Sequence, residues 1–254
     1  MIGGAYWALQ SSRVQTFLVQ KLTGRLSEKL NARVTIGKVD IALFKNIILE
    51  DVIIEDQKSD TLFFSRSVEA RIDSIRFRKK KLSIGHLRIG ESQINIKRDS
   101  ASQFNYTFLI DSLKNPEREI GDWQFFCDLF RFEGSDLSYD DFHAGSPKSY
   151  TVNDLSFNIS GFALLEDSLF FKINQLTLND GKDFEIHKLN TTFHADGNQL
   201  TFSGIQLETK RSNINDSRFR IELPEKEEPL TESMQIDFRF SHSKISFLDL
   251  ARLI

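Results

Sequence analysis

The sequence has few of the residues from which disulfide frameworks, thiolate metal cages and nucleic-acid surfaces are built. Its 254 residues contain 1 cysteine, Cys127, which excludes an intrachain disulfide and a metal site made of several thiolates. The 33 Lys and Arg residues are outnumbered by 36 Asp and Glu residues, so the chain lacks the basic excess of nucleic-acid-binding proteins. We therefore expect no nucleic-acid partner. A single cysteine does not indicate whether the protein works in an oxidising or a reducing compartment.

Familiar catalytic motifs are also absent. The chain contains no G-x-S-x-G elbow, no phosphate-binding loop, no G-x-G-x-x-G and no H-E-x-x-H. Its histidines stand singly, as solvent-facing strand residues do. One acidic segment contains Asp136, Asp140, Asp141 and His143. It lacks the ordered oxygen spacing of a calcium site, so we interpret it as a solvated turn. We predict no catalytic residue, no cofactor and no metal.

Proline and glycine are scarce, whereas phenylalanine is abundant. The 4 Pro and 13 Gly residues stand beside 23 Phe residues, a bias towards β-strands. An eight-residue sequence pattern, here called the strand figure, recurs with apolar side chains at its first, third, sixth and eighth positions. It reads "VTIGKVDI" from residue 34 and "LSIGHLRI" from residue 82, and further copies start at residues 70, 171 and 200. In these five copies polar residues or Gly occupy the other four positions. With that condition chance would give about 0.8 copies in a chain of this composition, so the figure indicates a recurring strand geometry.

The two-residue gap inside this figure has two structural interpretations. In a regular strand successive side chains alternate between faces, so the gap would place the second apolar pair on the opposite face. A β-bulge adds one residue, bends the strand and returns that pair to the first face. Glycine occupies the gap at Gly37, Gly85 and Gly204, where it would tolerate the left-handed conformation of a bulge. We favour the bulge over two short strands joined by a kink.

Most copies of the strand figure begin about 12 to 16 residues after the preceding copy, which leaves room for a turn but not for a crossover helix. The spacing predicts a mostly antiparallel meander, with polar turns at residues 77–83, 140–149 and 224–233. Between the figures we expect plain alternation, for example at Trp123, Phe125, Cys127 and Leu129. A sheet of this kind must cover its apolar face with a second sheet, by closing into a barrel, or with a bound apolar ligand.

Helices are predicted at two places. Residues 11–31 carry an apolar stripe at helical spacing, formed by Val14, Leu18, Leu22, Leu26 and Leu30. Asn31 suits the left-handed residue that often ends a helix. Residues 108–119 predict a second, short helix that is ended by Pro116.

Two segments leave a membrane role open. Residues 1–9 read "MIGGAYWAL", about half of the roughly 20 apolar residues that cross a bilayer. They form either a short buried segment or the end of a longer anchor. A basic run consists of Arg76, Arg78, Lys79, Lys80 and Lys81. It either contacts anionic lipid head groups or forms a hairpin tip that faces water.

Residues 14–72 resemble the membrane-proximal start of the TamB branch of AsmA-like envelope proteins. The shared order is an amphipathic helix, the strand "VTIGKVDI", the strand "IILEDVIIED" and then "DTL". The segments "LETKRSNI" at 207–214 and "ISFLDLARLI" at 245–254 resemble pieces that recur between repeats of this branch. The chain lacks a complete anchor helix and the region by which such proteins reach the outer membrane, so it resembles an N-terminal portion.

The resemblance implies an elongated, strongly curved antiparallel β-sheet that forms an open groove. Residues 1–10 would end a membrane anchor, residues 11–31 would cap the groove, and residues 32–254 would form a groove that continues further. The implied function is non-enzymatic transfer of phospholipid through the periplasm of a Gram-negative bacterium, from an inner-membrane anchor. The alternative is a scaffold that assists outer-membrane protein assembly with an Omp85-type barrel.

The apolar positions of the figures are the candidate lining of such a groove. They are Val34, Ile36, Val39, Ile41, Ile47, Leu49, Ile72, Ile75, Leu82, Ile84, Leu87, Ile89, Ile173, Leu176, Phe202 and Ile205. A third interpretation, a β-domain that cleaves carbohydrate or peptide, would require paired carboxylates that converge in a cleft.

Overall fold

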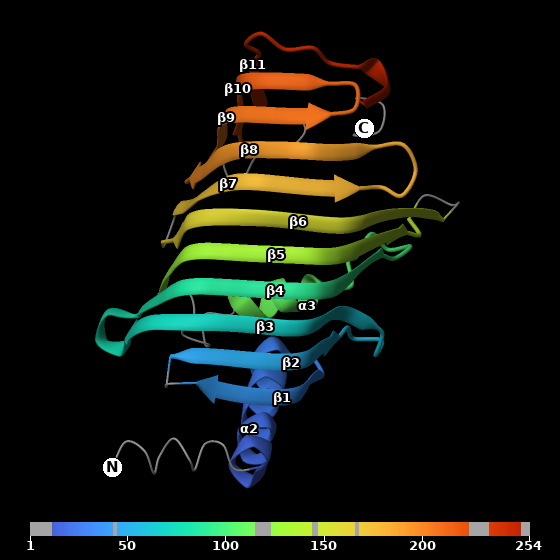
Figure 1. Ribbon diagram of the computed structural model, residues 1–254. Coiled ribbons are helices and arrows are strands. Elements are labelled where there is room, and N and C mark those ends of the chain that lie inside the picture. The colour runs from blue at the N-terminus through green and yellow to red at the C-terminus, as the bar shows by residue number, and fades with distance from the viewer. Residues whose placement is uncertain are drawn as a thin grey trace.

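The computed structural model describes residues 12–42, 45–114, 123–143, 147–165, 168–223 and 234–249. It is mainly β, with 68% strand in a single mixed sheet that does not close. The eleven strands lie in the sheet in the order in which they occur in the chain, as Figure 1 shows. The predicted fold class, a long curved sheet with an N-terminal helix, is confirmed. The anchor predicted for residues 1–10 lies outside the described residues.

The elements are bounded as follows. The helices are α2 (Ser12–Leu30), η1 (Phe77–Lys79) and α3 (Thr107–Lys114). The strands are β1 (Val34–Ala42), β2 (Asn46–Glu55), β3 (Thr61–Arg76), β4 (Lys81–Arg98), β5 (Gln124–Asp141), β6 (Lys148–Leu164), β7 (Ser168–Asn179), β8 (Glu185–Asp196), β9 (Gln199–Thr209), β10 (Asn213–Glu222) and β11 (Gln235–Arg239).

The helix α2 packs against one face of β1. Apolar side chains of the helix contact a buried cluster in the strand, with Val19, Leu22, Leu26 and Leu30 on Val34, Ile36 and Val39. The amide of Val34 donates to Ser27 Oγ at 3.0 Å, which ties the strand to the last turns of the helix. Asn31 follows the helix with a φ of 50°, as predicted. Three residues of the predicted stripe, Leu22, Leu26 and Leu30, therefore pack on the buried cluster of β1, while the side chains of Val14 and Leu18 lie outside the description.

The helix α3, which belongs to the connection from β4 to β5, lies beside α2 on the same face. These two strands run parallel, whereas the other neighbouring pairs are antiparallel, so the chain must return to the rim at which β4 began. The helix α3 lies on this path, and Ser112 Oγ donates to the Leu30 carbonyl of α2 at 3.1 Å. The helix predicted over 108–119 is observed as Thr107–Lys114, and residues 115–122 lie outside the description. Within the described ranges, no helix has both the length and the apolar character needed to cross a bilayer.

The recurring figure keeps its apolar residues on one face. Val39 lies opposite Leu49, and Leu49 lies opposite Val68; directly opposed residues share a face. On the other side of the gap Ile36 lies opposite Val52, and both Ile36 and Val39 contact α2. The interpretation as two strands that use opposite faces is therefore wrong. We call the side that carries α2 the inner face and the other side the outer face.

A transverse row of irregular residues, here called the crease, makes such a change of alternation from β1 to β6. It passes through the gap of the figure in β1, whereas the figures of β3 and β4 have their gaps at a second irregularity, where the register shifts between residues 71 and 74. Left-handed residues mark the crease in four strands, at Asp51, Glu91, Gly134 and Asp154. The register shifts next to the crease between β5 and β6. Between β1 and β2 the register is unchanged, because each strand contributes one extra residue at the same level. The predicted one-sided bulge therefore becomes a paired one at this edge of the sheet.

Serine side chains fill the crease beside these residues. Ser65, Ser92 and Ser135 lie next to one another on adjacent strands and are 0 to 2% exposed. Ser65 Oγ donates to the Gly90 carbonyl at 3.0 Å, and the Ser92 amide donates to Ser135 Oγ at 3.2 Å. The small hydroxyls satisfy backbone groups that the interrupted ladder would leave unpaired.

Glycine has a different function in the gaps from the one predicted. Of the three gap glycines only Gly204 is left-handed, with a φ of 63°, so the prediction is wrong for Gly37 and Gly85. A Cβ on Gly85 would lie 2.5 Å from Asp73 Oδ2 and would also overlap the Arg71 guanidinium. The Arg71 and Asp73 side chains approach Gly85 closely, so they would have to move if residue 85 carried a Cβ.

The plain alternation predicted for β5 is wrong. Phe130 lies opposite Leu87 on the inner face, whereas Leu129 lies opposite His86 on the outer face. β5 therefore carries the eight-residue figure too, with apolar residues at Phe125, Cys127, Phe130 and Phe132. The pattern was hidden in the sequence because apolar residues also occupy two of its filler positions.

The crease generates a test of backbone strain. We expect Gly134→Ala to lower the free energy of unfolding by about 1 kcal/mol, because a residue with a Cβ is strained at the φ of 58° found there. No atom lies within 4 Å of the added Cβ, so contacts do not contribute.

Gly24→Ala in α2 is the matched control, because its added Cβ is equally unobstructed. It should raise the free energy of unfolding by up to about 1 kcal/mol, since alanine is the better helix former. Urea titrations followed by circular dichroism measure both variants. A Gly134→Ala protein as stable as the parent would contradict the assigned conformation.

Candidate functional site

The inner face is a continuous apolar surface that extends from β1 to β11. The register connects it strand by strand, for example from Ile89 to Phe132, from Phe132 to Phe157 and from Phe157 to Leu176. Beyond neighbouring strands, the main contacts between described elements are those of α2 with β1 and with α3. No second sheet therefore covers the inner face within the described residues.

The structure places all the predicted lining residues on the inner face, in three environments. Val34, Ile36 and Val39 are 0 to 4% exposed beneath α2, so the helix already occupies that part of the groove. Ile75 is 45% exposed at the rim. The others are half-buried, namely Ile41, Ile47, Leu49, Ile72, Leu82, Ile84, Leu87, Ile89, Ile173, Leu176, Phe202 and Ile205.

Sequence reasoning missed most of an aromatic ladder that crosses β6 to β11. Its rings follow one another with centroid separations of 6.4, 4.8, 4.8, 6.0 and 5.3 Å, in the order Phe162, Phe171, Phe193, Phe202, Phe219 and Phe238. Contacts between cross-strand aromatic rings stabilise a sheet beyond the area that they bury. The abundance of phenylalanine was the available signal, but only the register shows which rings share a row.

The ladder borders an apolar cavity of about 520 Å³ at the C-terminal end of the sheet. Ile173, Phe202 and Ile205 lie in its wall together with Phe219 and Phe238, so the sheet brings predicted lining residues from β7 and β9 into one site. Its volume falls within the range of about 300 to 1,000 Å³ that small-molecule sites occupy. The segment 245–249 closes one side of this cavity with Ile245 and Asp249.

Asp249 anchors that segment to the sheet. It is 4% exposed and accepts hydrogen bonds from Thr209 Oγ1 and Ser212 Oγ, both at 2.6 Å. The Arg211 guanidinium lies 3.7 Å from the other carboxylate oxygen. Burial alone would raise the pKa of Asp249, but the hydrogen bonds from Ser212 and Thr209 and the charge of Arg211 lower it below the ordinary value of 3.8.

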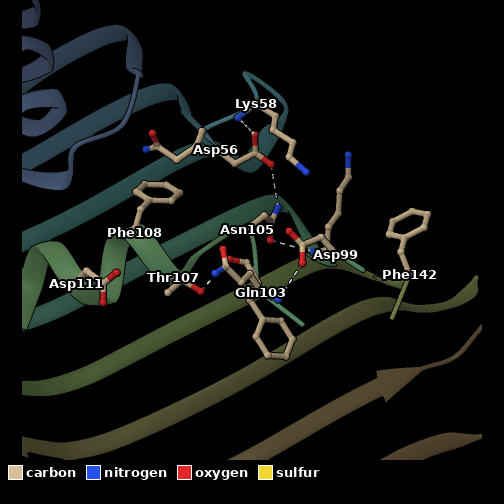
Figure 2. Close-up of a pocket in the computed structure, with 12 residues that line it drawn as sticks. Asp56, Lys58, Asp99, Gln103, Asn105, Thr107, Phe108, Asp111 and Phe142 are labelled. Atoms are coloured by element: carbon tan, nitrogen blue, oxygen red, sulfur yellow. Dashed lines mark hydrogen bonds between the residues drawn. The ribbon is translucent and has the colours of Figure 1, made fainter. Parts of the chain in front are cut away.

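A second, polar pocket of about 320 Å³ lies at the rim, between the β2–β3 turn and the crossover that follows β4. Figure 2 shows its side chains converging from these segments. Asp56 Oδ2 accepts a hydrogen bond from Asn105 Nδ2 at 3.1 Å, while Asp56 Oδ1 accepts from the amides of Lys58 and Asp60. Because these carboxylate oxygens already bind donors of the chain, the pocket fastens the crossover rather than presenting free ligands.

The outer face is charged and paired. Arg88 donates to Glu133 at 2.8 Å and to Glu69 at 3.1 Å across three neighbouring strands, and Lys38 pairs with Glu50 at 2.8 Å. The carboxylates of Glu133 and Glu69 raise the pKa of Arg88 above its usual value. Exposed pairs of this kind stabilise by at most about 1 kcal/mol each. The solvated charge pairs thus lie on the outer face, which also carries some apolar side chains such as Leu129 and Phe170.

The side chains considered above as metal ligands instead form hydrogen bonds with other groups of the protein. Asp141 accepts hydrogen bonds from the amide of His143 at 2.9 Å and from the Tyr139 hydroxyl at 3.1 Å, and Asp140 accepts one from Ser149 Oγ at 2.6 Å. Within the described part of the chain, no three His, Cys, Asp or Glu side chains come together as metal ligands would. Four of the histidines are exposed, whereas His86 is half-buried and its Nε2 has no partner.

Comparison of the chain with protein-family models and with curated proteins gave no match.

Closure of the C-terminal cavity should depend on the charge of Asp249. Because its pKa is lowered in the folded state, Asp249 stabilises the fold above its unfolded pKa and loses this effect as the pH falls through the folded pKa. We expect Asp249→Asn to speed hydrogen exchange at the Ser246 amide, which donates to Ser212 Oγ at 2.9 Å. The difference from the parent should be full at neutral pH and vanish in acid.

Asp237→Asn provides the control, because Asp237 lies on β11 with its side chain 48% exposed. It should leave exchange at Ser246 unchanged at every pH. A parent protein whose Ser246 amide exchanges as fast as that of Asp249→Asn at neutral pH would show that Asp249 does not anchor the segment.

Proposed function

We propose that this protein is a non-enzymatic conduit that carries phospholipid acyl chains along its inner face. The observation that supports it best is the half-buried apolar row that crosses the whole sheet without a second layer. A sandwich would bury these side chains against a facing sheet, whereas a groove for a mobile ligand leaves them partly accessible. The apolar cavity beside the aromatic ladder gives one place where an acyl chain would fit.

The energetics favour such a surface. Each methylene group exposed to water costs about 0.8 kcal/mol, so two acyl chains of roughly 30 carbons in total would face a barrier near 20 kcal/mol between membranes. A continuous apolar row removes most of that barrier. Acyl chains form no hydrogen bonds, so an inner face on which apolar side chains predominate would let them slide without a fixed site.

The resemblance to the TamB branch supplies the cellular setting of the proposal. In it the protein is periplasmic and anchored to the inner membrane of a Gram-negative bacterium, and it moves phospholipid towards the outer membrane. The amphipathic helix α2 supports this setting, because it fills the β1 end of the inner face as the cap in such a groove would. No metal or cofactor takes part in the proposed transfer.

A second candidate function is a scaffold that assists outer-membrane protein assembly with an Omp85-type barrel. The strand β11 supports it, because β11 is the last strand in the sheet order and is exposed along its whole length. Its apolar residues Ile236 and Phe238 are 56% and 39% exposed. An accessible edge can pair with a strand of a partner protein.

Photocrosslinking from two adjacent residues of β7 tests the conduit. Leu176 lies on the inner face opposite Phe157, and Gln175 lies on the outer face opposite Asn158. A benzophenone amino acid at residue 176 should crosslink to phospholipid in intact cells, whereas the same group at residue 175 should not. Mass spectrometry of the adducts identifies the lipid.

A pair of phenylalanines extends this test to lipid content. Phe171 lies on the inner face in the aromatic ladder, and Phe170 is 41% exposed on the outer face beside His194. Phe171→Glu should reduce the lipid that native mass spectrometry detects on the purified protein, and Phe170→Glu should retain it. Equal labelling at residues 175 and 176, or crosslinks to protein alone, would contradict the conduit and favour the scaffold.

A further inference from the structure

The turn between β3 and β4 projects beyond the ends of the neighbouring strands, on the left of Figure 1. The short helix η1 forms the turn, and Lys80 closes it in the left-handed conformation with its amide donating to the Phe77 carbonyl at 3.1 Å. This turn holds Phe77 outward with 74% of its surface exposed, next to Ile75, which is 45% exposed. We call residues 75–81 the tip.

The tip is strongly basic and contains no carboxylate. Arg76, Arg78 and Lys79 are exposed, and among the described residues none of them forms an ion pair. The acidic residue that precedes the tip, Asp73, pairs with Arg71 at 3.3 Å. The local charge therefore opposes the net charge of −3 of the whole chain.

Aromatic side chains support the base of the tip. The ring of Trp123 contacts Phe77 edge to face, with centroids 6.0 Å apart. The ammonium group of Lys81 lies 3.8 Å from the centroid of the Phe126 ring, a distance at which a cation is attracted to the ring face. Tryptophan and phenylalanine beside lysine and arginine are the residues that settle at a membrane interface.

We propose that the tip is a docking surface for an anionic phospholipid bilayer. Phe77 enters the interfacial region, Trp123 lies at the level of the head groups, and Arg76, Arg78 and Lys79 contact lipid phosphates. A basic surface that bound nucleic acid or an acidic protein would use its charges without requiring an exposed Phe77. This inference stands independently of the conduit, because it uses no residue of the inner groove beyond its rim.

Tryptophan fluorescence of the full chain tests the proposal directly. The chain contains 2 tryptophans, so Trp7→Phe leaves Trp123 as the sole reporter. Vesicles that contain phosphatidylglycerol should shift its emission to shorter wavelength, and brominated acyl chains should quench it. Vesicles of phosphatidylcholine alone should do neither. Binding that leaves the Trp123 emission unchanged would overturn the proposal, because another part of the chain would then carry the contact.

A charge and aromatic variant supplies the second measurement. Phe77→Ser, Arg78→Glu and Lys79→Glu together should weaken binding to the anionic vesicles more than about tenfold. These side chains are exposed, so the urea midpoint should be unchanged.

The matched control is Phe247→Ser with Lys182→Glu and Lys188→Glu, since Phe247 is 81% exposed and both lysines are exposed. It removes one phenylalanine and reverses two positive charges away from the tip, so the net charge changes equally, and it should retain binding. Equal loss in both triple variants would indicate a response to net charge alone. A tip variant that loses binding to polyglutamate or RNA but not to vesicles would assign the surface to another partner.

Discussion

The structure depends on one constraint: a single β-sheet has to keep its apolar side chains on one face while it bends. In a regular strand the side chains alternate strictly between the two faces, so one extra residue would move all the following apolar side chains to the opposite face. The crease resolves this conflict, because left-handed residues at Asp51, Glu91 and Gly134 restart the alternation on the same face. The bending that makes a groove and the continuity of its apolar surface therefore have the same structural origin.

Burial in the crease differs from burial in an ordinary core. Ser65, Ser92 and Ser135 are among the least exposed side chains of the described residues, whereas most apolar residues of the inner face are only half-buried. The tightest packing thus protects backbone hydrogen-bonding groups, and the apolar side chains remain accessible. This distribution suits a surface whose ligand changes position, since the sheet keeps its shape whether or not an acyl chain is present.

Much of the fold could be predicted from periodicity, because the strand repeat and the stripe of α2 depend on local spacing. The identity of the left-handed residues could not. Glycine was the expected choice, yet Asp51 and Glu91 take that conformation, whereas Gly85 does not and instead lies close to the side chains of Arg71 and Asp73. Such contacts arise between strands and leave no local signal.

The site was predictable in part for the same reason. Residues such as Ile84 and Leu87 stand in clear figures, so their common face followed from spacing. Phe171 and Phe193 come together only through the pairing of β7 with β8, and the anchoring of Asp249 by Thr209 joins residues 40 positions apart. The parallel pairing of β4 with β5 also escaped prediction, because the meander inferred from the short connections was applied to the whole sheet, although the connection between Arg98 and Gln124 is long.

The agreement between strand order and chain order also has a kinetic consequence. Each new strand of the sheet can add to its predecessor by closing a short loop, so folding can proceed by successive addition, as in repeat proteins. The parallel pair is the exception, since β5 can join β4 only after the long connection between Arg98 and Gln124 has closed. That step should divide folding into two cooperative blocks, β1 to β4 and β5 to β11, each of which can gain or lose strands at its free edge.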